Sequence, residues 1–121
     1  MIVAQKAKQD FSETALQILK IDNFFNEALH TAALRPAARL LLFIMVKRSV
    51  SIKQAMLDSP LSYRAFYIMI ERLKDAALLD VKSDDEDRRV RRLVLGRQFD
   101  HILEKMPAFL EKDLLKITPV I

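Results

Sequence analysis

Residues 51–79, SIKQAMLDSPLSYRAFYIMIERLKDAALL, decide the fold of this chain. The capping-box pair Ser51 and Gln54 predicts a helix of about two turns, which the Asp-Ser-Pro sequence at 58–60 ends. Ser62 can cap a second, longer helix, because apolar residues recur within it at i, i+3, i+4 and i+7. These residues are Phe66, Met69, Ile70 and Leu73. The stretch therefore predicts two helices joined by a tight turn.

The residues that follow change from helical to alternating spacing. Leu79 and Val81 alternate with polar residues, and beyond an acidic turn at 83–87, Leu93 and Leu95 recur at the same spacing of two. This pattern predicts a two-stranded hairpin. Its return strand is expected to begin with Arg88, Arg89, Val90, Arg91 and Arg92.

Residues 10–31 are predicted to form a helix with a wide apolar surface. Asp10 and Glu13 stand at the capping-box spacing at its start. One set of apolar residues forms a stripe at helical spacing, and four others lie off it. The stripe holds Phe11, Ala15, Ile18, Phe25, Leu29 and Ala32, and the others are Leu16, Leu19, Ile21 and Phe24. Such a helix is either deeply buried in its own domain or shared with a second subunit, and we favour the second interpretation.

Two more helices are predicted. One begins at Pro36, which suits a first helical turn, and runs to about Lys47. The other covers residues 97–116 and is expected to bend or end at Pro107. Together with the helix at 10–31, it is expected to form a dimer interface.

The composition favours one helical domain over residues 1–121. A chain of this length buries a single core, and one Gly and four Pro leave little material for the turns of a many-stranded β fold. The absence of Cys excludes disulfides and thiolate metal sites. The longest apolar run, Leu40 to Val46, is far shorter than the roughly 20 residues of a membrane-spanning helix. Because the N-terminus also shows no signal-peptide pattern, we expect a cytoplasmic protein.

The positive charge is concentrated in the middle of the chain. The net charge is +4, but residues 34–97 alone hold fourteen basic and eight acidic residues, a net +6. The flanking segments, 1–33 and 98–121, each carry −1. A concentrated basic segment is typical of proteins that contact phosphates, whereas charge that only aids solubility is spread out.

The order of these elements is typical of a winged helix-turn-helix domain, which is mainly α with a small β-hairpin wing. In such a domain the second helix of the pair enters the major groove of duplex DNA, and the basic hairpin reaches towards the minor groove. Arg64 is expected to read a guanine, Ile68 to meet a thymine methyl, and Lys53 to hold a phosphate. The other expected DNA contacts are Ser62, Tyr63 and Tyr67 on the helix and Arg88, Arg89 and Arg91 in the wing.

Residues 61–79 and 84–95 resemble the recognition helix and wing of MarR-type transcriptional regulators, and the resemblance spans about residues 34–106. The family's wing reads D-x-x-D-R-R before an alternating strand. Asp84, Asp87, Arg88 and Arg89 stand at those positions here. The resemblance implies a dimeric, sequence-specific DNA-binding repressor or activator, with Arg89 in the minor groove and Asp87 orienting it.

Two positions depart from the family pattern. Ala77 stands where the family has the glycine that ends the recognition helix, and Gly96 stands where it has threonine. The segment after the wing, 97–121, is short for the family's dimer scaffold and effector pocket. No small-molecule effector is identified, because the apolar residues that would line its pocket look like core residues in a sequence.

Neither an enzyme nor a metal site is predicted. A single glycine excludes the G-x-G-x-x-G and Walker motifs, and no catalytic triad or carboxylate pair can be assigned. His30 and His101 have no second ligand at metal spacing. The acidic turn lacks the central glycine and distal glutamate of a calcium loop. We therefore expect no catalytic residue, cofactor or bound metal.

Two alternatives stand beside the DNA-binding interpretation. The wing arginines could simply pair with the acidic residues at 84–87, although exposed pairs contribute only about 0–1 kcal/mol. The domain could also be a protein–protein adaptor, in which Ile68 and the two tyrosines contact a partner chain.

Overall fold

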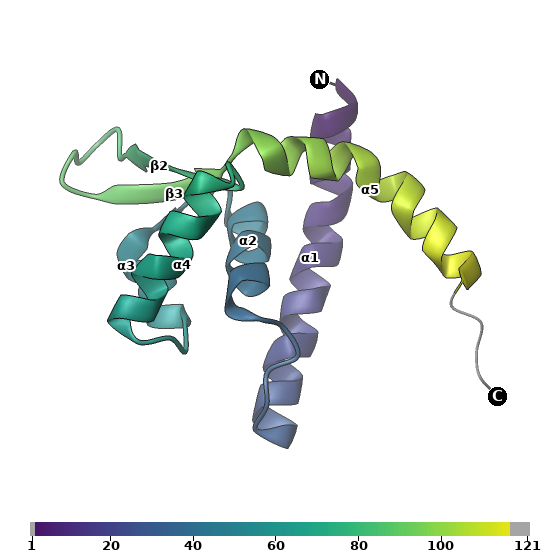
Figure 1. Ribbon diagram of the computed structural model, residues 1–121, viewed down its shortest axis with the longest axis horizontal. Coiled ribbons are helices and arrows are strands. Elements are labelled where there is room, and N and C mark those ends of the chain that lie inside the picture. The colour runs from purple at the N-terminus through teal and green to yellow at the C-terminus, as the bar shows by residue number, and fades with distance from the viewer. Residues whose placement is uncertain (1, 117–121) are drawn as a thin grey trace.

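The computed structural model describes residues 2–116, which fold into five helices and a small sheet. In chain order the elements are α1 (Ile2–Leu29), α2 (Pro36–Lys47), β1 (Val50–Ser51), α3 (Ile52–Asp58), α4 (Tyr63–Asp75), β2 (Leu79–Ser83), β3 (Arg91–Leu95) and α5 (Arg97–Lys116). Figure 1 shows α2 between the long α1 and the α3–α4 pair, with α5 crossing α1 and the β2–β3 hairpin projecting on the other side. None of the helices in this range is long and apolar enough to cross a membrane.

The predicted starts of three helices are confirmed. The hydroxyl of Ser51 accepts a hydrogen bond from the Gln54 amide at 3.1 Å, and the Gln54 side chain accepts one from the Ser51 amide at 3.4 Å. This is a complete capping box at the start of α3. Ser62 caps α4 by accepting from the Ala65 amide at 3.2 Å, and Pro36 is the first residue of α2.

α5 covers residues 97–116, as predicted, with Pro107 inside it. A proline within a helix cannot donate a hydrogen bond to the preceding turn and favours a kink. Figure 1 shows that α5 changes direction about halfway along its length. The helix therefore bends in this region and does not end.

The ends of α1 differ from their prediction. The helix begins at Ile2 and not at Asp10, because residues 2–9 contain neither Gly nor Pro and are mostly good helix formers. It ends at Leu29, since His30 adopts a left-handed φ of 54°. The apparent capping box at the predicted start is thus part of the helix interior.

The buried face of α1 is also rotated relative to the predicted stripe. Ala15 and Leu19 are buried, whereas Phe25 and Leu29 are 37% and 59% exposed. The reason is visible in Figure 1, where the C-terminal turns of α1 extend beyond α2 and α5. Among residues 11–29 of α1, the exposed large apolar residues are Leu16, Ile21, Phe24, Phe25 and Leu29.

The sheet contains one strand that the sequence analysis did not predict. Its order is β1-β3-β2, with both pairs antiparallel. Leu93 on the central strand is paired with Val50 on one side and with Val81 on the other. The two-residue β1 therefore joins the hairpin to the connection between α2 and α3.

The return strand starts three residues later than predicted, at Arg91 and not at Arg88. The amide of Asp84 donates to the Val90 carbonyl at 2.9 Å, and the Val90 amide donates to the Asp87 carbonyl at 3.0 Å. These bonds are made within the loop, so the residues before Arg91 belong to the wing tip and not to the strand.

The core consists of two apolar clusters that share α2. Ile44 faces the first cluster, around Phe66 and Leu93, which joins the α3–α4 pair to the sheet. Its neighbour Met45 faces the second, around Ala15 and the first half of α5. The α3–α4 pair with the sheet and the α1–α5 pair are therefore packed on opposite sides of α2.

Asp22 is a charged residue buried in this structure, with 2% of its surface exposed. One carboxylate oxygen accepts hydrogen bonds from the amides of Ala33 and Leu34 at 2.7 and 2.9 Å, and the other accepts from Arg39 at 2.7 Å. Burial alone would raise the pKa of Asp22, but these hydrogen bonds outweigh it and hold the pKa below the ordinary 3.8. Asp22 thus joins α1 by hydrogen bonds to the segment between α1 and α2 and to α2 itself.

A pH series tests this role. Because the folded-state pKa of Asp22 is lowered, its stabilisation is present above the unfolded value of 3.8 and is lost as the pH falls through the folded value. Asp22→Asn should lower the free energy of unfolding by about 3 kcal/mol at neutral pH. The difference in free energy of unfolding between wild type and Asp22→Asn, measured by urea denaturation, should become smaller below pH 3.8. Asp80→Asn, at an exposed position, is the control; an Asp22→Asn gap of constant size at every pH would contradict the assignment.

Two residues that depart from the family pattern meet at one corner of the fold. Ala77, two residues beyond the end of α4, has a left-handed φ of 57°. The amides of Ala77 and Leu78 donate to the carbonyls of Lys74 and Leu73, each at 2.9 Å. This is a Schellman motif, in which glycine is usual. Gly96 lies against the same corner, where an added Cβ would come within 2.2 Å of the Ala77 carbonyl oxygen. The corner therefore requires glycine at 96 and tolerates alanine at 77.

Substitutions at positions 96 and 77 should change the stability of the fold in opposite directions. Gly96→Ala should destabilise the fold by about 2–4 kcal/mol, because backbone atoms must move apart. Ala77→Gly should stabilise it by about 0.5–1 kcal/mol, because it removes the left-handed strain. Thermal and urea unfolding measure both effects. Ala76→Gly, at a φ of −80°, is the matched control and should bring no gain; a gain there equal to that at 77 would refute the strain argument.

Candidate nucleic-acid interface

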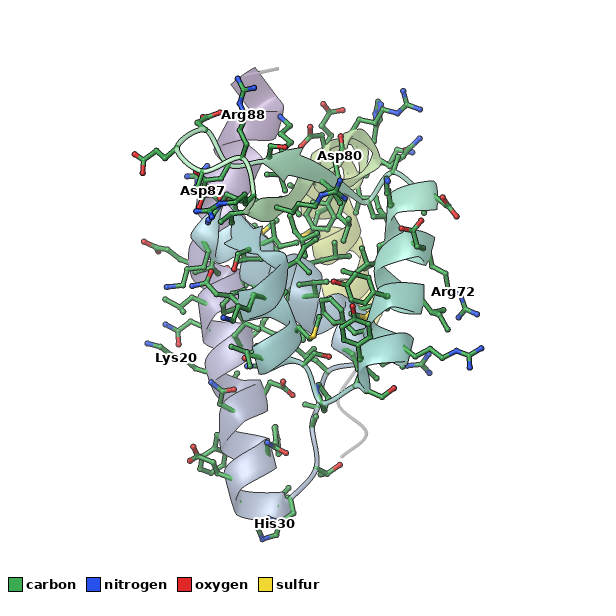
Figure 2. The ribbon with its side chains drawn as sticks, turned by 90° about the vertical axis from the view of Figure 1, so that its left-hand side faces the viewer. Lys20, His30, Arg72, Asp80, Asp87 and Arg88 are labelled. Atoms are coloured by element: carbon green, nitrogen blue, oxygen red, sulfur yellow. The ribbon has the colours of Figure 1, made fainter. Side chains whose placement is uncertain are left out.

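The N-terminal half of α4 presents most of its predicted contact residues to solvent. Tyr63 and Ile68 are 68% and 44% exposed, and Ser62 and Arg64 are also exposed. The opposite face of α4 is buried through Phe66, Ile70 and Leu73. Figure 2 shows another basic residue of this helix, Arg72, pointing away from the body of the molecule. The helix therefore offers a mixed polar and apolar ridge.

Tyr67 lies differently from its prediction, because it is half-buried and not fully outward. Its ring contacts those of Tyr63 and Phe66, with centroid distances of 4.8 and 5.6 Å. Burial, followed by a hydrogen bond with the Tyr63 hydroxyl, raises the pKa of Tyr67 above its ordinary 10.0. Tyr67 is thus a fixed, neutral hydrogen-bonding group at the edge of the ridge.

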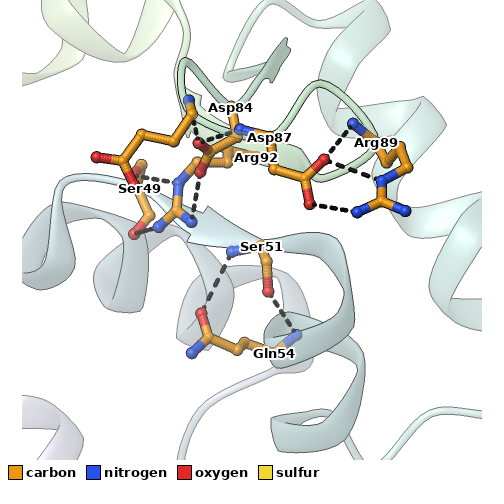
Figure 3. Close-up of polar contacts among 8 residues, drawn as sticks. Ser49, Ser51, Gln54, Asp84, Asp87, Arg89 and Arg92 are labelled. Atoms are coloured by element: carbon orange, nitrogen blue, oxygen red, sulfur yellow. Dashed lines mark hydrogen bonds and ion pairs between the residues drawn. The ribbon is translucent and has the colours of Figure 1, made fainter.

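The wing turn is built by its own carboxylates (Figure 3). One oxygen of Asp84 accepts from the amides of Glu86 and Asp87 at 2.8 and 3.2 Å, and these bonds lower the pKa of Asp84. Asp87 holds Arg89 in a two-point contact, with N–O distances of 3.1 and 3.3 Å, and accepts the Arg89 amide as well. Arg89 lowers the pKa of Asp87 and keeps its own side chain 91% exposed.

Arg92 anchors the wing to the body of the domain, a role that the sequence analysis missed. Its guanidinium donates to the hydroxyl and the carbonyl of Ser49 at 2.9 and 3.2 Å, and to Asp84 at 3.5 Å. The alternation of Arg92 with Leu93 places it on the opposite face of β3 from the core, but Ser49 lies 43 residues away and carries no sequence signal. Tertiary structure alone brings them together.

The alternative that the four wing arginines simply pair with the acidic residues at 84–87 therefore holds for two of them. Arg89 and Arg92 pair with Asp87 and Asp84. Within residues 2–116, Arg88 and Arg91 make no ion pair, and Figure 2 shows Arg88 directed away from the body of the molecule. Their charges are available to a partner.

A groove of about 470 Å³ brings residues of three elements together. Lys53 comes from α3, Tyr67 from α4, and Arg89 and Arg91 from the wing; Ile52, Met56 and Val90 supply apolar surface, and Ser51 completes the lining. Three side chains in this lining are cationic and none is acidic. Arg64 and Ile68 are not among the lining residues and lie along the exposed ridge of α4.

Comparison with known proteins identifies the fold. No family model and no curated protein sequence matches the chain. The transcriptional regulator Tm0710 from Thermotoga maritima is 18% identical with a TM-score of 0.58, and the match covers 94% of this chain and 79% of that one. Apo MarR from E. coli is 17% identical with a TM-score of 0.53, over 95% of this chain and 75% of that one.

A third solved structure is BpsR from Bordetella bronchiseptica, described by the regulation of its DNA binding by 6-hydroxynicotinic acid. It is 19% identical with a TM-score of 0.51, over 97% of this chain and 77% of that one. The chain has the winged helix-turn-helix fold of MarR-type transcriptional regulators.

Proposed function

We propose that the protein is a cytoplasmic transcriptional regulator, without enzymatic activity, that binds duplex DNA sequence-specifically as a homodimer. The observation that carries this proposal is the cationic groove between Lys53 of α3, Tyr67 of α4 and the wing arginines, directly beside the exposed ridge of α4. Phosphate contacts from cationic side chains fix the position of a protein on duplex DNA, and this groove supplies three such side chains next to the helix that would read the bases.

Each predicted contact then has a role. Arg64 reads a guanine in the major groove and Ile68 contacts a thymine methyl, while Ser62 and Tyr63 lie at the helix N-terminus against phosphate or base edges. Lys53 and Tyr67 hold the backbone. In the wing, Asp87 presents the exposed Arg89 guanidinium to the minor groove, flanked by Arg88 and Arg91.

The apolar surface of α1 supports the homodimer. Phe24 and Leu29 are 65% and 59% exposed in the single chain, and Ile102 on α5 is 45% exposed. Burying large apolar side chains of this kind gains about 1.5–3 kcal/mol each. A homodimer through segments 10–31 and 97–116 would cover them and present two recognition helices to adjacent turns of DNA.

Salt-dependent binding tests the DNA proposal. A random DNA pool first selects the preferred operator, and affinity for it should fall with salt at a log-log slope near −0.9 per phosphate contact. Lys53→Ala should weaken all sequences alike and flatten that slope by about 0.9 per lost contact. Arg64→Ala should cost about 1–3 kcal/mol and relax the preference at one base pair.

Arg72→Ala is the matched control, since it removes the same charge from the last turn of the same helix. It should leave base preference unchanged. No detectable binding to any duplex at low salt would reject the regulator and favour the adaptor, in which Tyr63 and Ile68 contact a protein.

Sedimentation tests the homodimer. The wild-type chain should sediment as a dimer at micromolar concentration, and Phe24→Glu should shift it to monomer, because the charge would lose its hydration in the interface. Leu57→Glu, on α3 where the wild-type side chain is 79% exposed, is the control and should stay dimeric. A wild-type chain that sediments as a monomer would reject the homodimer. Equal behaviour of Phe24→Glu and Leu57→Glu would reject α1 as its interface.

A further inference from the structure

Arg39 of α2 joins two parts of the fold through opposite edges of one guanidinium. Its Nη1 donates to Asp22 of α1 at 2.7 Å. Its Nε and Nη2 donate to the two carboxylate oxygens of Asp58 at 3.0 and 3.2 Å. Hydrogen bonds to Asp58 first, and then those to Asp22, raise the pKa of Arg39, so it is a permanent cation between two carboxylates.

The two carboxylates differ in what they are attached to. Asp22 is buried and is also held by the Ala33 and Leu34 amides, so it is a fixed point of α1. Asp58 is the last residue of α3, directly before the turn that leads to the Ser62 cap of α4. The Arg39 contacts therefore run from the proposed dimer helix to the turn before the recognition helix.

This link differs in kind from the apolar packing around it. Apolar helix contacts are non-directional and allow small sliding movements. A planar guanidinium in a two-point contact, such as that of Arg39 with Asp58, fixes angles as well as distances. The α3–α4 pair also meets the rest of the fold through the apolar cluster and the sheet, and through backbone hydrogen bonds at the corner after α4. Arg39 adds a directional side-chain link from α1 to the α3–α4 pair.

We propose that Arg39 is a positioning residue that sets the orientation of the α3–α4 pair relative to α1. This proposal rests on the proposed function, because in a dimer held by α1 that orientation sets the separation of the two recognition helices. Half-sites about one helical turn apart, roughly 34–36 Å, can be bound together only if that separation is correct. Arg39 would therefore determine half-site spacing without touching DNA.

Asp58→Asn is the sharpest variant for the test. It replaces one of the two Asp58 oxygens that accept from Arg39 with an amide nitrogen, which cannot accept, and so breaks the two-point contact while leaving the contact with buried Asp22. It also removes a negative charge from a helix C-terminus, where such a charge is unfavourable. Arg39→Lys is the second variant, since it keeps the charge and loses the planar fork. Asp75→Asn is the matched control, because it makes the same change at the last residue of α4, where the side chain is exposed.

The first readout is binding to the selected operator with one or two base pairs inserted or deleted between half-sites. Wild type and Asp75→Asn should lose at least tenfold in affinity with each altered spacing. Asp58→Asn and Arg39→Lys should bind the best operator about tenfold more weakly than wild type does. Their affinities for the operators of altered spacing should lie within about threefold of their own affinity for the best operator. A merely structural role would weaken all operators by one factor and keep the spacing profile, which would overturn the proposal.

The second readout does not need DNA. The sequence has no cysteine, so Lys20→Cys and Arg72→Cys introduce two unique, exposed labelling sites on α1 and α4, which Figure 2 shows on opposite sides of the molecule. Spin labels at these sites, in protein diluted with unlabelled chain, report the distance between the two helices. The distribution should be narrow in the otherwise wild-type background and broader with Asp58→Asn; equal widths would overturn the proposal. If wild type binds no DNA, the proposed function fails, while the distance measurement still decides the role of Arg39.

Discussion

The arrangement of the helices depends on how one buried charge is satisfied. Asp22 would be costly to bury without donors, and it finds them in two backbone amides and one guanidinium. These donors come from the connection after α1 and from α2, so the end of α1, that connection and α2 must meet at one point. Arg39 carries the same constraint on to α3 through Asp58. A single polar network therefore joins the long N-terminal helix to the helix-turn-helix unit.

The remaining polar contacts divide the wing between internal structure and outward charge. Asp84 and Asp87 close the turn and hold Arg92 and Arg89, and Arg92 ties the wing to Ser49. Arg88 and Arg91 take no part in these ion pairs within the described residues. The acidic turn is thus a frame that positions basic side chains, which explains why a basic wing contains so many carboxylates.

The exchange of small residues at the corner after α4 has a local cause. Ala77 is in the left-handed conformation in which glycine is usual, while the only glycine of the sequence lies at 96, against the Ala77 carbonyl. Strain at one backbone position and close approach at another are separate demands, and one glycine can meet only one of them. In this chain the glycine is placed at position 96, where a Cβ would otherwise overlap with backbone atoms.

The sequence by itself determined the local elements: the Ser51 and Ser62 caps, the spacing of Phe66, Ile70 and Leu73, and the acidic turn lie within a few residues of what they control. The tertiary structure decided the buried face of α1, the strand β1, the burial of Tyr67, and the contacts of Arg92 with Ser49 and of Arg39 with Asp22. Local hydrogen bonds and helical periodicity are encoded in neighbouring residues. Pairings across 17 or 43 residues have no such signal, because they arise only when separate elements pack together.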